Sequence, residues 1–172
     1  MNDTEPGDGG AAERAYLGLD PQAAALLRAE KPVLERALPG VLDRFYARTV
    51  QQPALASTFA GAERVAFAKQ AQARHWAHLF EGRFDAAYRE SARRIGMAHY
   101  RSGLGPSAYI SGYAFILGDL LGTVATSRRG WGRRHDLPAR LAAVSRAVLY
   151  DMMMAISTYW ETQAGESHLE FP

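Results

Sequence analysis

The chain has 172 residues, of which 48% are hydrophobic and 22% are charged, and its formal net charge is +2. This length suits one domain with a substantial core, and the lack of cysteine in the sequence excludes disulfides, thiolate metal ligands and iron–sulfur clusters. No apolar run reaches about eighteen residues, and the N-terminus is polar, so we expect a cytoplasmic chain that neither crosses a membrane nor carries a leader. The 31 alanines and 18 arginines are strong helix formers and favour an all-α fold.

The composition of the first part of the chain predicts a disordered segment, and the residues after that segment are predicted to form helices. Residues 1–12 are rich in glycine and acidic residues, a composition typical of disordered segments. A helix should begin at an N-cap, Asp20, with a proline in its first turn, and should be broken by Pro32. Apolar residues spaced by three and four over residues 34–49 predict a second long helix, kinked or starting late at Pro39.

Four further helices are expected downstream of a short apolar piece that ends at Phe59. Helical spacing of apolar residues covers residues 65–79, 85–99, 106–124 and 137–159, which are separated by glycine, proline or polar breaks. No segment shows sustained alternation of apolar and polar residues. The sequence therefore predicts six or more helices and no sheet.

The loop before the last predicted helix carries the dense basic run of the chain, which is Arg128, Arg129, Arg133 and Arg134. Glycines interrupt this run. Such a segment is more typical of a solvated loop between helices than of a phosphate-binding surface. We therefore expect no nucleic-acid partner.

The histidines are more informative than any enzyme motif, because no GxSxG, GxxxxGK[ST] or strand-linked GxGxxG pattern occurs. His75 and His78 lie three apart on one predicted helix but lack a third zinc ligand at the usual spacing. His99 lies late in a helix, in the run RIGMAHYRSGLGP, whereas His135 and His168 are expected to be exposed. A helical histidine among apolar neighbours is commonly a hydrogen-bonded core residue. The small residues around His99 alternatively allow a flat macrocycle to approach, as at a proximal haem ligand.

Tyr46 lies in the apolar stripe of residues 34–49, where a buried hydroxyl needs a hydrogen-bond partner. Two interpretations are open. The hydroxyl bonds a backbone carbonyl, or it donates to a diatomic ligand on haem iron.

These residues belong to a longer pattern. The chain has FY at residues 45–46, HW at 75–76, LFxG at 79–82, IGxxH at 95–99 and GLxP at 103–106. The pattern resembles the signature of globin-coupled sensors, a family of bacterial haem-globin sensors, and the resemblance extends from about Leu19 to Tyr159. It implies an all-α globin fold with an extra N-terminal helix, and haem b as the cofactor.

The resemblance also implies roles for individual residues. His99 matches the proximal iron ligand, and Tyr46 matches the distal residue that donates to bound oxygen. Tyr109 matches the tyrosine that bonds or braces the proximal imidazole. His75 matches a histidine near the haem edge that pairs with a propionate.

Four other residues are implied to shape the haem pocket. Phe59 matches a position that packs on the porphyrin, and Phe45, the first residue of the FY motif, is implied to be a cofactor-binding residue. Ala68 and Ala71 stand on the distal helix where the family often carries bulkier residues. Small side chains there are expected to open the distal pocket and to admit water or hydroxide to the ferric site.

The function implied by the resemblance is haem-based oxygen sensing, with CO and NO as other gas ligands. Residues 13–162 would form the sensor domain, which is itself not an enzyme, and residues 163–172 would begin a linker to an output module. A histidine kinase of a two-component system is favoured over a diguanylate cyclase or a chemotaxis module. Two alternatives stay open: a stand-alone protoglobin-like globin that binds oxygen or detoxifies nitric oxide, and a haem-free helical dimerisation module.

A homodimer is expected through the last two predicted helices. The apolar stripe of the last helix is wide enough for a helix buried in one subunit or for an interface, and the resemblance favours the interface. The predicted interface residues are Tyr113, Leu117, Leu120, Leu141, Val144, Val148, Met152 and Ile156.

Overall fold

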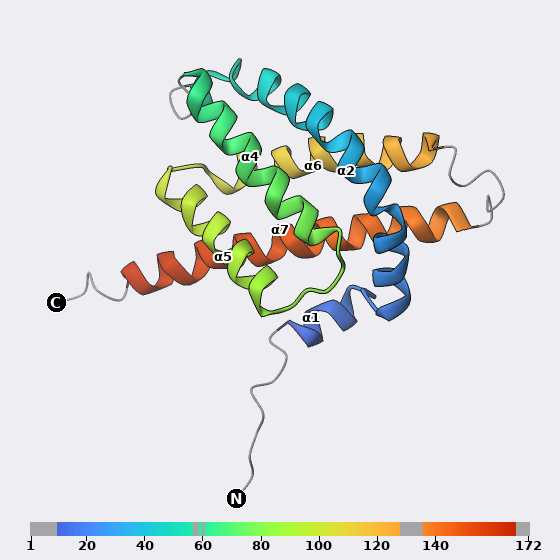
Figure 1. Cartoon of the computed structure of the whole chain (residues 1–172). Coiled ribbons are helices and arrows are strands. Elements are labelled where there is room, and N and C mark those ends of the chain that lie inside the picture. Colours follow the sequence, from blue (N-terminus) through green and yellow to red (C-terminus); the bar gives the residue numbers. More distant parts are fainter. Residues whose placement is uncertain (1–9, 57–58, 60, 128–135, 168–172) are drawn as a thin grey trace, which may run out of the picture.

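The computed structural model describes residues 10–56, 59, 61–127 and 136–167 (Figure 1). Within these ranges the chain forms helices and no strand. The helices are α1 (Ala11–Tyr16), α2 (Pro21–Thr49), α3 (Pro53–Ala56), α4 (Ala62–Leu79), α5 (Ala86–Arg101), α6 (Pro106–Thr126) and α7 (Leu137–Ser167). The prediction of an all-α fold is confirmed. The basic run at residues 128–134, together with His135 and His168, lies outside the described residues.

Helix ends follow the expected capping residues. Asp20 caps α2 by accepting a hydrogen bond from the backbone N–H three residues later, at 2.8 Å. Asp85 caps α5 in the same way, at 2.9 Å. α1 begins at Ala11, within the last residues of the segment predicted to be disordered, and α7 extends over residues 163–167, the first residues of the predicted linker.

The predicted break at Pro32 is wrong, because α2 is one helix that passes through both Pro32 and Pro39. A proline inside a helix removes one backbone hydrogen bond and bends the axis, and α2 changes direction along its length in Figure 1. Apolar burial on both sides of Pro32 offsets that loss. The buried apolar residues of this helix include Leu27, Leu34, Leu38, Val41 and Leu42.

α7 is the central helix of the core, and it packs against α2, α4, α5 and α6. Figure 1 shows it crossing the molecule. Its wide apolar stripe therefore faces helices of the same chain on several sides.

This packing corrects half of the predicted dimer interface. Tyr113, Leu120, Val144 and Val148 are buried within one chain, so they are not available to a second copy. The other predicted interface residues, Leu117, Leu141, Met152 and Ile156, are partly buried.

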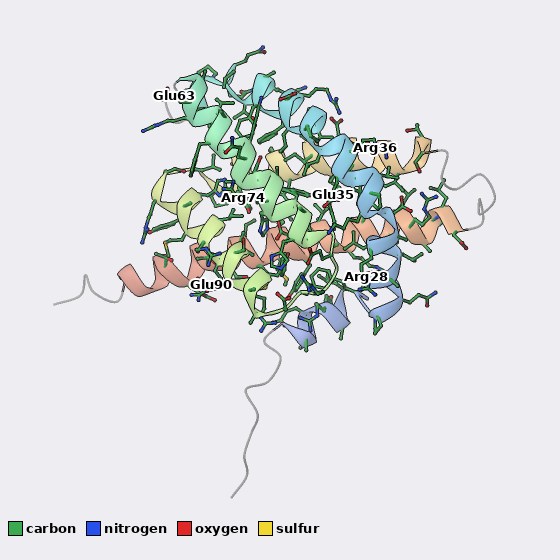
Figure 2. All side chains as sticks on the ribbon, viewed as in Figure 1. Arg28, Glu35, Arg36, Glu63, Arg74 and Glu90 are labelled. Carbon is green, nitrogen blue, oxygen red and sulfur yellow. The ribbon has the colours of Figure 1, made fainter. Side chains whose placement is uncertain are left out.

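Charged side chains lie on the outer faces of the helices that enclose this core. Arg28 and Arg36 on α2, Arg74 on α4 and Glu90 on α5 are exposed (Figure 2). The arginines of these helices are thus mostly solvated.

Two helices, α6 over Pro106–Thr126 and α7 over Leu137–Thr158, are long and apolar enough to span a membrane by length and composition alone. Core helices of helical domains meet the same criterion. Both helices here pack against α2 and against each other.

Candidate functional site

A cavity of about 540 Å³ lies among α2, α4, α5 and α6, within the size range of small-molecule and cofactor pockets. It brings together five of the residues that the sequence singled out, namely Phe45, Tyr46, Phe59, His99 and Tyr109. Three others, Ala68, Ala71 and His75, are not among the residues that line it. Much of the remaining wall is apolar.

His99 presents one ring nitrogen with a free lone pair. Its Nδ1 lies 2.8 Å from the carbonyl oxygen of Ile95, one turn earlier on α5. Because a carbonyl only accepts, Nδ1 carries the proton, and Nε2 is left unprotonated and able to bind a metal. Burial lowers the pKa of His99, against the opposite effect of this hydrogen bond, so the ring stays neutral at neutral pH. The ring is thus fixed in the tautomer and orientation that metal ligation needs.

Tyr109 braces the His99 ring from the α6 side. The two rings meet edge to face with their centroids 5.0 Å apart. The Tyr109 hydroxyl donates to the hydroxyl of Tyr113, one turn along α6, at 3.0 Å. The ring contact agrees with a bracing role.

Tyr46 reaches the cavity from α2 with its hydroxyl unpartnered by any residue in the described part of the chain. Its ring packs edge to face on Phe45 at 5.0 Å and on Phe59 at 5.4 Å. Burial raises the pKa of Tyr46 well above its ordinary value, so the phenol stays protonated and can donate a hydrogen bond. The backbone-carbonyl interpretation of Tyr46 is therefore not supported.

Gln72 is a cavity residue that the sequence reasoning missed. Its Oε1 is the buried side-chain polar atom that lacks a hydrogen-bond partner within the described residues. Gln72 interrupts the apolar stripe of α4, and a polar residue in such a stripe was the available signal. Ala68 and Ala71 lie half-buried on the same helix, so α4 turns an amide to the cavity where small apolar side chains were expected.

His75 lies in a different place from the one expected. It is buried, with Nε2 at 2.8 Å from Oδ1 of Asp151 and Nδ1 at 3.0 Å from Oγ of Ser91. Both ring nitrogens are therefore engaged inside the protein, and His75 is not among the residues that line the cavity. The sequence showed the HW motif but not which helix face meets α7.

Arg48 is the arginine that lines the cavity. Its guanidinium lies 5.7 Å from the centroid of the Phe115 ring, a cation–π distance. No pattern in the sequence marked it among eighteen arginines. It can pair with an acidic group at the cavity.

The side chains of the cavity could hold a metal ion only if the ion came with other ligands of its own. No group of three or more His, Asp or Glu side chains that could hold a bare ion occurs among residues 10–56, 59, 61–127 and 136–167. His99 offers one nitrogen in an apolar cavity. A flat cofactor that supplies its own equatorial ligands fits this arrangement.

The chain is similar to known globin proteins. The Protoglobin family model matches residues 11–164. The heme-based aerotactic transducer HemAT of Halobacterium salinarum is 28% identical over 163 residues, which are 91% of this chain and 33% of the transducer. The chain therefore spans about a third of that relative. The globin domain of the Geobacter sulfurreducens globin-coupled sensor superposes with a TM-score of 0.77 at 21% identity, over 87% of this chain and 97% of that one. This likeness shows a shared globin fold.

Proposed function

The chain belongs to the protoglobin family, and from this premise we propose that it is a haem-binding domain that senses a diatomic gas. The observation that carries the proposal is the His99 imidazole, neutral, oriented and open at Nε2, in a cavity that also holds an unpartnered phenol and amide. The similar transducer is named as heme-based and aerotactic, which supports the same assignment.

The residues of the cavity fit haem. His99 Nε2 would hold the iron, and the Phe45 and Phe59 rings would pack on the macrocycle and exclude water. Arg48 would pair with its carboxylates. Haem, when bound, would supply an iron that takes up a gas reversibly. Covalent attachment of haem through a CxxCH motif requires cysteines that the sequence lacks, and we propose haem b, held without a covalent bond, as the cofactor.

The wall opposite His99 would select the ligand. Tyr46 can donate a hydrogen bond from its protonated hydroxyl. The NH2 group of the Gln72 amide is a second possible donor, whereas its Oε1 only accepts. A ligand with partial negative charge, such as oxygen, gains most from these donors, whereas CO and NO depend on them less. We therefore propose oxygen as the preferred ligand.

The signal would leave through α7. The transducer is longer than this chain, and we propose that a transmitter module follows the globin domain of the full-length protein. Whether it is a kinase, a cyclase or a chemotaxis module would be read from the sequence of the complete gene. A homodimer through the partly buried residues of α6 and α7 stays a prediction, which sedimentation equilibrium would test.

Titration of the purified chain with haemin tests the proposal. We expect saturable binding with a Soret band that shifts with dithionite and again with CO. His99→Ala should abolish stoichiometric binding, because it removes the metal ligand. His78→Ala is the matched control, since His78 lies on α4 outside the cavity and should leave the stoichiometry unchanged. Equal retention of haem by both variants would reject the ligand assignment, and a wild-type chain without a Soret band would reject the function.

A further inference from the structure

A buried carboxylate on the central helix, Asp151, joins three other helices. It is fully buried on α7. Its Oδ2 accepts from the hydroxyl of Tyr113 on α6 at 2.7 Å. Its Oδ1 accepts from the hydroxyl of Tyr88 on α5 at 2.6 Å and from Nε2 of His75 on α4 at 2.8 Å. One side chain of α7 thus ties together three of the four helices around the cavity.

The cavity end of this network reaches the proposed metal ligand. Tyr113 accepts from Tyr109, and the Tyr109 ring lies against the ring of His99. Both tyrosines line the cavity, whereas Asp151 does not. The path from α7 to the imidazole therefore consists of two hydrogen bonds and one ring contact.

A second contact joins α7 to the same helix turn. Gly96 precedes His99 by three residues and lies directly on the backbone of Ala155, so that a Cβ at Gly96 would collide with the Ala155 carbonyl oxygen. Ala155 is one turn after Asp151 on α7. The His99 end of α5 is thus held to α7 by a backbone contact and by the polar network.

Stability alone does not account for this network. Taking a carboxylate and an imidazole out of water costs free energy, and their hydrogen bonds do no more than offset that cost. Proteins in which apolar residues replace a buried ion pair are often as stable as the original protein. A network whose members are all partnered does fix the positions of its side chains. Position is therefore the property that Asp151 supplies.

We propose that Asp151 is a positioning residue, which holds the Tyr113–Tyr109 pair against the His99 ring and so couples the cavity to α7. The proposal rests on the proposed function for what occupies the cavity. A change in the position of His99 would reach α7 through the tyrosine pair, and by linkage a change in α7 would alter binding at His99 to the same extent.

The test compares four variants of the full chain before and after haemin is added. Asp151→Asn weakens both sides of the network, and Tyr113→Phe removes the donor on the cavity side. Tyr88→Phe removes a donor to the same carboxylate on the far side. Asp119→Asn, which breaks an ion pair with Arg44 at the surface, is the control for loss of a carboxylate.

Amide hydrogen exchange over residues 95–113 is the first measurement, made on the haem-free chain. We expect Asp151→Asn and Tyr113→Phe to speed exchange there by about tenfold, the effect of losing a hydrogen bond to a charged group. Tyr88→Phe and Asp119→Asn should leave it within about twofold. In the haem-loaded chain, the iron–histidine stretching band should shift in the first pair only.

Each outcome decides whether Asp151 positions the tyrosine pair or only adds to the overall stability of the chain. Equal effects of Tyr88→Phe and Tyr113→Phe, or no effect of Asp151→Asn beyond that of Asp119→Asn, would overturn the proposal. If Asp151→Asn does not fold, the two tyrosine variants decide alone. A wild-type chain that binds no haemin would refute the proposed function, while the exchange comparison would still settle the role of Asp151.

Discussion

The two walls of the cavity differ in how their polar groups are partnered. On the wall formed by α2 and α4, the Tyr46 hydroxyl and Gln72 Oε1 have no partner within the described residues. On the wall formed by α5 and α6, His99 and Tyr113 have their hydrogen bonds in place, and the latter ends on Asp151. A buried polar group without a partner costs free energy. We therefore expect a ligand to complete the first wall. The second wall already has the hydrogen bonds that hold His99 in place, and it leaves Nε2 of that ring open.

We call the wall formed by α5 and α6 the framework wall. We expect it to tolerate substitutions less well than the wall formed by α2 and α4, and Gly96→Ala should show the largest effect. Alanine in a helix would ordinarily gain up to about 1 kcal/mol over glycine. The new Cβ would meet the backbone of Ala155, which cannot rotate away, and overpacking of this kind costs about 1–3 kcal/mol. We expect a net loss of about 1–2 kcal/mol in the free energy of unfolding, measured by urea denaturation.

Gly118→Ala on α6 is the matched control, because a Cβ there meets nothing within 4 Å. It should stabilise the chain by about 0.5–1 kcal/mol. Equal changes in the free energy of unfolding for Gly96→Ala and Gly118→Ala would mean that α5 does not lie on the backbone of α7. The contrast between the two walls would then be weaker.

The helices were predictable from the sequence because caps, glycines and apolar spacing act over one or two turns. Asp20 and Asp85 marked helix starts correctly. The error at Pro32 has a physical cause: a proline is a local signal, while the burial of α2 on both sides of it is tertiary and outweighs the lost hydrogen bond.

The site was predictable only where one side chain carries its own signal. His99 stood out among small neighbours, and the structure places it in the cavity with Tyr46. Gln72 and Asp151 are polar residues within the apolar stripes of α4 and α7, and the sequence does not tell what such a residue faces. The partner of His75 was not predictable for the same reason, since Asp151 lies 76 positions away along the chain.

The framework wall should also lose stability in acid. Burial would raise the pKa of Asp151, but the charge of His75 and the hydrogen bonds from His75, Tyr88 and Tyr113 outweigh it and hold this pKa below its usual range. A lowered carboxyl pKa contributes stability above the unfolded value of about 4, and this stability is lost as pH falls through the folded pKa. The free energy of unfolding should therefore fall as the pH is lowered below about 4.

Asp151→Asn should make this acid dependence less steep, whereas Asp119→Asn should not. A residual slope is expected from Glu81 and Asp85, whose pKa values are also lowered by hydrogen bonds and neighbouring positive charge. Denaturation curves at pH 3 to 6 give the measurement. An unchanged slope in Asp151→Asn would mean that the carboxylate is not held ionised by its neighbours.

On the wall formed by α2 and α4, a substitution should raise the free energy of unfolding instead of lowering it. Gln72→Leu tests this, and its expected effect is the smallest. Leucine removes a buried carbonyl oxygen that has no partner, so the haem-free chain should gain about 1 kcal/mol in the free energy of unfolding. If Gln72 also bonds the gas, oxygen should dissociate about threefold to tenfold faster from the haem-loaded variant in stopped-flow measurements. Tyr46→Phe offers a parallel test of the same wall. A loss of stability in Gln72→Leu would show that the amide has a structural partner. The polar groups of both walls would then be partnered within the protein, and the contrast between the walls would disappear.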